Sequence, residues 1–152
     1  MEIRKANVKD AKNIHQLLLE GANKGELLPR SLNEIYDNIR DFFVLYEDGQ
    51  LIGVSALHIC WEDLAEVRSL MVREDMRDRG LGTELLSLCL EEAKKLGVKK
   101  VFALTYKVKF FKKHGFHVID KKELPHKIWS DCIKCSKFPD CDEEAVILDL
   151  EE

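Results

Sequence analysis

The sequence predicts an α/β (α+β) domain built on a mixed central sheet, and three observations predict this class. An Asp48-Gly49 pair separates two apolar runs, which is typical of a tight antiparallel hairpin. Further along, a strand, a glycine-containing turn and an amphipathic helix precede a second apolar strand, which is the pattern of a parallel crossover. Two amphipathic helical segments come before the hairpin, so the sheet is expected to have helices packed on it.

Length and composition favour one globular domain over residues 1–152, which is long enough to bury roughly 70% of its unfolded surface. The formal charge of −4 provides no global positive field, so nucleic acid is not expected as a partner. Residues 1–5 lack an apolar signal region, and no run approaches the ~18 apolar residues of a membrane span. A cytoplasmic protein without a membrane partner is therefore expected.

The first elements follow from helical spacing and caps. Residues 3–5 are predicted as a short strand. The helix after it is expected to begin near Asn7 and end at Gly21. Ser31 and Glu34 have the spacing of a capping box, which predicts the start of a second helix.

The central elements follow in order. Residues 42–46 and 51–57 form the two strands of the hairpin, and residues 65–72 form another strand. A helix is predicted from Thr83 to Leu96, ended by Gly97.

The remaining elements complete the sheet. Residues 101–104 are continuously apolar, as expected of a strand covered on both faces that pairs in parallel with residues 66–72. A short helix over 108–113, a strand from 116 to 119 and a last strand over 145–148 follow.

The turn from Arg77 to Thr83 has the pattern R-x-x-G-x-G between a strand and a helix. Backbone N–H groups at a helix N-terminus have no partner within the helix, and glycines let a ligand approach them, so the turn is suited to a pyrophosphate. The Rossmann and Walker spacings are absent, which disfavours dinucleotides and ATP. The alternative is a tight connection with solvated Arg77 and Arg79 side chains.

Together with the strand Glu66–Val72, which reads E-x-x-x-L-x-V, this turn resembles motif A of the GNAT superfamily of acetyltransferases. Phe110–Phe116 resembles the second motif of that superfamily. The resemblance implies a mostly antiparallel sheet with one splayed parallel strand pair and helices on both faces. It also implies acetyl-CoA as cosubstrate.

The resemblance places the pantetheine of acetyl-CoA beside Leu70, Met71 and Val72. It places the pyrophosphate at the turn, and Phe111 against the core or the cofactor. The cofactor-binding residues expected in the turn are Arg77, Asp78, Arg79, Gly80, Leu81, Gly82 and Thr83.

A closer resemblance is to short N-acetylglutamate synthase-like proteins, carried by Ala65–Leu70, by Val101–Tyr106 and by the segment 124–127. It implies an N-acetyltransferase that acts on the α-amino group of an amino acid, L-glutamate, as the first step of arginine biosynthesis. A protein, peptide or polyamine acetyltransferase is an alternative within the same fold. A noncatalytic CoA-binding or metal-sensing module is an alternative from another class.

Acetyl transfer needs a neutral amine and a group that removes its proton. Glu66 is the candidate base, acting directly or through water, at the position where GNAT enzymes often carry a catalytic carboxylate. Arg68 should point to the same face, where its guanidinium could bind a substrate carboxylate through two hydrogen bonds. The alternatives are a surface carboxylate at Glu66 and a simple Glu66–Arg68 ion pair. Arg4 and Lys107 are further candidate carboxylate contacts.

The superfamily's usual general acid is a tyrosine in the second motif, but Phe111 occupies the matching position and cannot donate a proton. Tyr106 is the nearest substitute in sequence, with packing as its alternative role. Water is a further proton donor for the departing thiolate.

The five cysteines are an odd number, which favours free thiols, metal ligands or redox groups over a disulfide framework. His126, Cys132, Cys135 and Cys141 have a spacing compatible with zinc, although the second C-x-x-C pair of a ribbon is missing and zinc is not favoured. Redox pairing of Cys132 with Cys135 and a loop of reduced thiols are the alternatives.

The histidines His15, His58, His114 and His117 follow no catalytic spacing and are expected to be structural or surface residues. A homodimer is one alternative for the oligomeric state, because a sheet edge that pairs with a second chain has the same sequence pattern as an edge that is covered.

Overall fold

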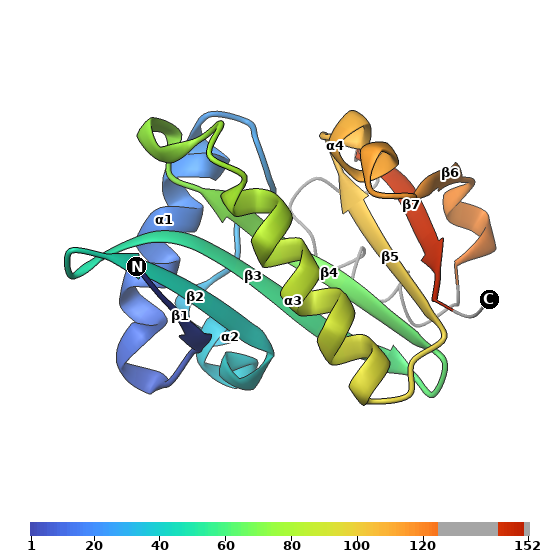
Figure 1. Ribbon diagram of the computed structural model, residues 1–152, viewed down its shortest axis with the longest axis horizontal. Helices are drawn as coiled ribbons and strands as arrows, with labels where there is room; N and C mark the ends of the chain where they lie inside the picture. The colour runs from blue at the N-terminus through green and yellow to red at the C-terminus, as the bar shows by residue number, and fades with distance from the viewer. Residues whose placement is uncertain (125–142, 151–152) are drawn as a thin grey trace.

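A single seven-stranded sheet with helices on both faces forms the centre of the protein in the computed structural model (Figure 1). The structure describes residues 1–124 and 143–150. The strand order is β1-β2-β3-β4-β5-β7-β6. The neighbours β4 and β5 are parallel and the other neighbouring pairs are antiparallel. The predicted fold class is thus confirmed.

Helices and strands are interspersed along the chain, with β2, β3 and β4 consecutive. The strands are β1 (Glu2–Lys5), β2 (Phe42–Glu47), β3 (Gln50–Trp61), β4 (Leu64–Val72), β5 (Lys100–Thr105), β6 (His117–Ile119) and β7 (Glu144–Asp149). The α-helices are α1 (Ala11–Asn23), α2 (Leu32–Asp37), α3 (Leu81–Lys95) and α4 (Val108–Lys113). Short 3-10 helices are η1 (Val8–Asp10), η2 (Ile39–Asp41), η3 (Glu74–Met76) and η4 (Lys121–Glu123).

The predicted caps and turns have the expected geometry. Ser31 accepts a hydrogen bond from the N–H of Glu34, and the Glu34 carboxylate bonds back to the Ser31 N–H. Asp48 and Gly49 both have positive φ angles, 52° and 77°, which is the backbone of a type I′ hairpin turn. These local signals fixed the start of α2 and the β2–β3 turn.

The predicted end of the first helix at Gly21 is wrong, because α1 continues to Asn23. Gly21 lies inside the helix, and a Cβ there would lie 2.9 Å from the Met71 sulfur on β4. The glycine is needed for close packing of α1 on the sheet, rather than for helix termination. The structure also starts α3 at Leu81, two residues before the predicted Thr83, and extends β3 to Trp61.

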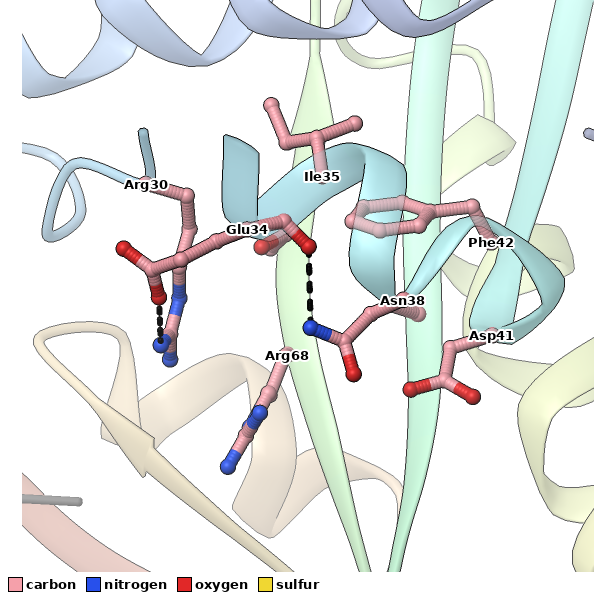
Figure 2. Close-up of a pocket in the computed structure, with 9 residues that line it drawn as sticks. Arg30, Glu34, Ile35, Asn38, Asp41, Phe42 and Arg68 are labelled. Atoms are coloured by element: carbon pink, nitrogen blue, oxygen red, sulfur yellow. Dashed lines mark hydrogen bonds and ion pairs between the residues drawn. The ribbon is translucent and has the colours of Figure 1, made fainter. Parts of the chain in front are cut away.

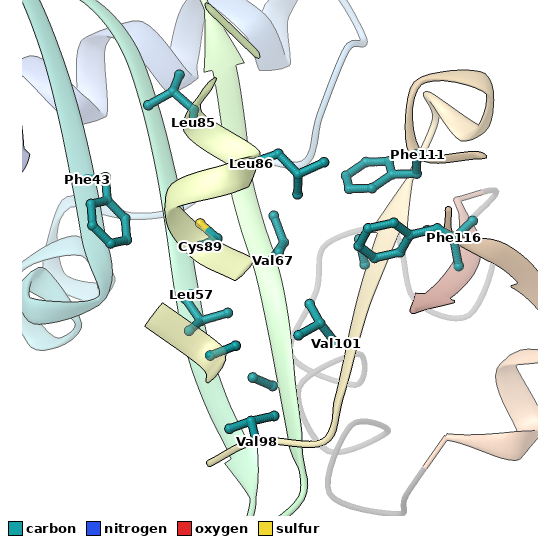
Figure 3. Packing of buried hydrophobic residues seen from close by; sticks show 14 of the residues in the cluster. Phe43, Leu57, Val67, Leu85, Leu86, Cys89, Val98, Val101, Phe111 and Phe116 are labelled. Carbon is teal, nitrogen blue, oxygen red and sulfur yellow. The ribbon is translucent and has the colours of Figure 1, made fainter. Parts of the chain in front are cut away.

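Two apolar layers hold the helices onto the sheet. On one face, α3 packs Leu85, Leu86 and Cys89 against buried strand residues such as Val67 and Val101 (Figure 3). On the other face, α1 packs its apolar side against β2, β3 and the β4 residue Met71. Full burial of each aliphatic side chain of this kind stabilises the fold by about 1.5–3 kcal/mol.

The pairing of β4 with both neighbouring strands, β3 and β5, changes part-way along its length. Its parallel ladder with β5 ends at the pair Glu66–Phe102. Towards β3, the register shifts between the pairs Arg68–Ala56 and Met71–Val54, which makes a β-bulge. Ser69 lies in this bulge with φ of 54°, a left-handed conformation that costs a non-glycine residue roughly 1–2 kcal/mol.

A polar cluster joins β1 to the start of α1. The Arg4 guanidinium donates two hydrogen bonds to the Asp10 carboxylate, at 2.8 and 3.0 Å, and packs over the Tyr46 ring. Asp10 also accepts from the Asn7 backbone N–H and the Tyr46 hydroxyl, each at 2.8 Å. The Arg4 hydrogen bonds are the main reason that the pKa of Asp10 falls from 3.8 to about 2, against the opposing effect of burial.

Because the folded-state pKa of Asp10 is depressed, its stabilisation is present above pH 3.8 and is lost as the pH falls through about 2. We expect Asp10→Asn to lower the free energy of unfolding by about 2 kcal/mol at pH 7, with the difference from wild type shrinking below pH 4. Urea unfolding at a series of pH values measures both. The exposed Asp37→Asn variant is the control, and a pH-independent difference for Asp10→Asn would contradict the account.

Candidate active site

A cleft of about 1130 Å³ opens where β4 and β5 diverge. One wall is the segment 26–31 between α1 and α2, and the opposite wall is the end of β5 with α4. The β4 residues 66–70, together with residues 76–78 and 80–83 of the turn and the start of α3, also line it. A cleft of this size accommodates a large cosubstrate together with a small acceptor.

The N-terminus of α3 opens into this cleft without a side-chain cap. Gly80 is the N-cap residue with φ of 76°, and no side chain in the described part of the chain caps it. A Cβ at Gly80 would meet no atom within 4 Å, and one at Gly82 would touch only the Phe110 ring at 3.5 Å. The N–H groups of the first turn of α3 thus face an open cradle with the geometry of an anion site.

Arg77, the first residue of the R-x-x-G-x-G turn, joins two walls of the cleft through its hydrogen bonds. Its Nε donates to the Val72 carbonyl at 3.0 Å, and its two Nη atoms bond the Glu26 carboxylate at 2.5 and 3.1 Å. Glu26 also accepts from Lys107 Nζ at 3.3 Å. Arg77 lowers the pKa of Glu26, with Lys107 adding to the effect, and Glu26 raises the pKa of Arg77. Glu26 therefore links the segment before α2 to both sides of the diverging strands.

Glu66 and Arg68 lie together in the cleft on β4. Glu66 is buried, with 5% of its surface exposed. Its Oε1 accepts from Arg68 Nε at 2.6 Å, so the predicted ion pair exists. Both side chains also line the cleft, so the pair is part of the site rather than of the outer surface.

Arg68 also lines a small side pocket, of about 20 Å³, against α2 and η2 (Figure 2). Arg30 enters the same pocket and lies 3.4 Å from the Glu34 carboxylate, while the Asn38 amide donates to the Glu34 backbone carbonyl at 2.9 Å. Arg30 and Arg68 both line the main cleft as well. The two arginines thus share the side pocket as well as the cleft, and Arg68 is bonded to Glu66.

His58 lines the same part of the cleft from β3. Its Nδ1 lies 2.7 Å from Asp41 Oδ2, on the 3-10 helix η2. The antiparallel register pairs His58 directly with Glu66. Residues directly opposite on antiparallel strands project to the same face, so the imidazole and the carboxylate are neighbours.

Most predicted cofactor residues line the cleft, and the others have different surroundings. The predicted cofactor residues that line it are Leu70, Val72, Arg77, Asp78, Gly80, Leu81, Gly82, Thr83 and Phe111. Met71 is not a lining residue and packs against α1. Arg79 is paired with Glu47 at 3.3 Å outside the lining.

Of the predicted catalytic and substrate residues, Glu66, Arg68 and Lys107 line the cleft. Tyr106 is not among the lining residues. Arg4 also lies outside the lining, and its guanidinium is held in the β1–α1 cluster by Asp10. The structure therefore holds Arg4 away from the cleft, through its two hydrogen bonds to Asp10.

The candidate metal ligands His126, Cys132, Cys135 and Cys141 lie outside the described residues. Within residues 1–124 and 143–150, no three His, Cys, Asp or Glu side chains form a potential metal site. In the same part of the chain, no helix has the length and apolar character needed to cross a membrane.

Sequence reasoning missed Glu26, Arg30 and His58 as residues of the cleft. Glu26 and Arg30 lie in a segment without a motif, and only the folded chain brings that segment to β4. His58 had a usable signal, because it follows directly after the predicted strand 51–57, which precedes the strand carrying Glu66. The sequence alone could not show that His58 pairs with Glu66, since a one-residue slip in strand register turns every side chain to the other face of the sheet.

The acetyltransferase (GNAT) family model matches residues 11–116, most of the chain. The chain belongs to the GNAT family of acetyltransferases. The matched segment runs from α1 to the start of β6, so it contains the cradle at α3 and the Glu66–Arg68 pair.

Two relatives show what kinds of GNAT protein the chain is similar to. An uncharacterised N-acetyltransferase from Chlorobaculum tepidum is 40% identical over 97% of this chain and 96% of its own. An amino-acid acetyltransferase from Mycobacterium tuberculosis is 32% identical over 85% of this chain and 75% of its own.

Two solved GNAT-type structures cover nearly the whole chain. N-acetylglutamate synthase from Neisseria gonorrhoeae, complexed with coenzyme A and N-acetyl-glutamate, superposes with a TM-score of 0.89 at 27% identity, covering 99% of this chain and 35% of its own. A Mycobacterium tuberculosis protein in complex with CoA superposes with a TM-score of 0.83 at 27% identity, covering 99% of this chain and 100% of its own.

The open N-terminus of α3 predicts binding of inorganic pyrophosphate. We expect Gly80→Ala to weaken this binding about fivefold, because the alanine either strains the turn by roughly 1 kcal/mol or moves the N–H groups away. Isothermal titration calorimetry measures the affinity.

Gly97→Ala is the matched control. Gly97 also has a positive φ, 83°, and open space around its Cβ, but it lies at the other end of α3. Equal loss of pyrophosphate affinity in the two variants would show that the anion does not bind at the start of α3.

Proposed function

We propose that residues 1–152 act as one acetyl-CoA-dependent N-acetyltransferase domain whose acceptor is the α-amino group of a small dicarboxylic amino acid, L-glutamate. The observation that carries the proposal is the pair of arginines, Arg30 and Arg68, which line both the cleft and its small side pocket, with Arg68 bonded to the buried Glu66. The Neisseria gonorrhoeae structure with coenzyme A and N-acetyl-glutamate supports it. Such an activity would belong to arginine biosynthesis in the cytoplasm.

The cradle at α3 and the open edge of β4 fit acetyl-CoA. The Gly80–Thr83 N–H groups would hold the pyrophosphate, because they lie in an uncapped first turn that side chains leave open. Leu70 and Val72 line the cleft on the part of β4 beyond its parallel ladder, where backbone groups are available to pantetheine. When bound, acetyl-CoA supplies a thioester activated for attack by an amine.

Two arginines that line the cleft match an acceptor with two carboxylates. Each guanidinium can donate two parallel hydrogen bonds to a carboxylate, which fixes orientation as well as position. Arg68 remains anchored by Glu66, and Arg30 by its partner Glu34. Lys107 is a further cation of the cleft, although Glu26 already neutralises part of its charge. The Glu26 link across the cleft favours a small acceptor over a protein chain, which would need an open groove.

Glu66 is placed to remove the proton of the acceptor amine, directly or through one water. It is buried and lines the same cleft as the two arginines that would hold the amino acid. Tyr106 is not a lining residue and Phe111 has no proton to give, so water is proposed to protonate the departing thiolate.

Incubation with acetyl-CoA and a panel of amino acids, with thiol release monitored, tests the function. We expect L-glutamate to give the highest kcat/KM and L-glutamine a value at least tenfold lower, because glutamine lacks the second carboxylate. Arg30→Gln should raise the KM for glutamate about tenfold, with a smaller change for glutamine. The exposed Arg40→Gln variant is the control.

Glu66→Gln should lower kcat at least a hundredfold while CoA binding stays within twofold of wild type. Release of thiol with lysine peptides or polyamines but not with glutamate would refute the acceptor assignment. An unchanged kcat in Glu66→Gln would remove the base assignment.

A further inference from the structure

We propose that His58, oriented by Asp41, is a second proton-accepting group of the site, which receives through Glu66 the proton that the acceptor amine loses. The inference rests on the proposed function and adds a route by which the proton leaves the cleft. Three observations carry it: the His58–Asp41 contact, the register that places His58 opposite Glu66, and the difference in exposure between the two groups.

The contact with Asp41 orients the imidazole. The Nδ1 to Oδ2 distance is 2.7 Å, and an ionised carboxylate can only accept a hydrogen bond, so Nδ1–H of His58 donates to Asp41. In the neutral ring the lone pair is then on Nε2, which becomes the proton-accepting atom. A base held by a third group in this way is the arrangement that general base catalysis uses.

The register places the imidazole next to the candidate base. His58 on β3 and Glu66 on β4 are direct Cα partners, so their Cβ atoms are expected to lie roughly 4.5–5.5 Å apart on one face of the sheet. Both side chains line the cleft. One oxygen of Glu66 already accepts the short hydrogen bond from Arg68, so transfer to His58 would use the other oxygen or a water.

The two groups differ in access to solvent. Glu66 is buried, whereas the side chains of His58 and Asp41 are 26% and 24% exposed. A proton on Glu66 therefore needs a neighbour that can pass it to bulk water, and the His58 imidazole, which lies opposite Glu66, combines a lone pair with exposure to solvent.

Charged groups of both signs lie around His58. The acidic groups that face this end of the cleft are Asp41 on η2, Glu66 on β4, Glu34 on α2 and Glu143 before β7, and the cations are Arg68 and Arg30. The direct contact is with the Asp41 carboxylate, which fixes the imidazole ring through Nδ1.

The amine N–H bond breaks as the C–N bond to the acetyl group forms and the C–S bond breaks. The proton goes to Glu66 and then to Nε2 of His58. The thiolate takes a proton from water, and the imidazolium later returns one to bulk solvent, so no further reactant is needed.

Chemical rescue of His58→Ala in the full chain tests the proposal. We expect kcat for glutamate to fall about thirtyfold, with KM for both substrates within twofold of wild type, since the imidazole moves a proton and does not hold a substrate. Added imidazole should restore at least a third of the lost rate in proportion to its concentration. Asp41→Asn should lower kcat about tenfold, and added imidazole should not restore the rate, because the His58 ring of that variant still occupies the space that free imidazole would fill.

His117→Ala is the matched control, because His117 is exposed on β6 and outside the cleft. If His58→Ala does not fold, His58→Gln is assayed in its place. For that variant the acid side of log(kcat/KM) against pH should lose about one unit of slope, since one proton-binding group is gone.

Three results would overturn the relay alone. The first is an unchanged kcat in His58→Ala, and the second is a His58→Ala variant that unfolds at the wild-type temperature but is not rescued by imidazole. The third is an unchanged slope of the pH profile in His58→Gln. A wild-type protein that releases no thiol with any amino acid would overturn the proposed function, and the relay with it. The two failures are therefore distinguishable.

Discussion

The short parallel ladder between β4 and β5 is the constraint on which the site depends. The two strands pair at three positions, ending at Glu66 and Phe102, and then diverge. The bulge at Ser69 shifts the alternation of β4 at the same place, so that Leu70 packs with the α3 layer while Met71 packs with the α1 layer. A ladder that continued along β4 would fill the cleft with strand pairing and leave no backbone edge for a ligand.

Opposite charges are already paired throughout the cleft. Arg68 holds Glu66, and Glu26 is shared between Arg77 and Lys107. These pairs are partly or largely buried, so each fixes side chains at a cost in desolvation that surface pairs do not have. Their benefit is preorganisation: the groups that would meet an amino acid or a proton are held in place before it arrives.

The sequence predicted most of the fold and the cradle, and the reason is locality. The caps at Ser31, the Asp48-Gly49 turn and the R-x-x-G-x-G turn each act within a few residues, so their chemistry can be read directly. Arg4 lies outside the cleft because its guanidinium is held by Asp10. His58 was expected to be a structural or surface residue because its place in the cleft depends on the β3–β4 register and on Asp41. The β3–β4 register shifts between Ile59 and Trp61, and this irregularity decides which face His58 shares.

A titration of isotope-labelled protein with coenzyme A, followed by amide NMR shifts, tests most directly whether the end of this ladder makes the binding site. The account predicts the largest shift changes at Leu70, Val72 and the first turn of α3, with small changes at Leu64 and Ala65, where β4 is still paired with β5. Large changes confined to the β1–β2 side of the sheet, with none at α3 or beyond the bulge, would contradict it.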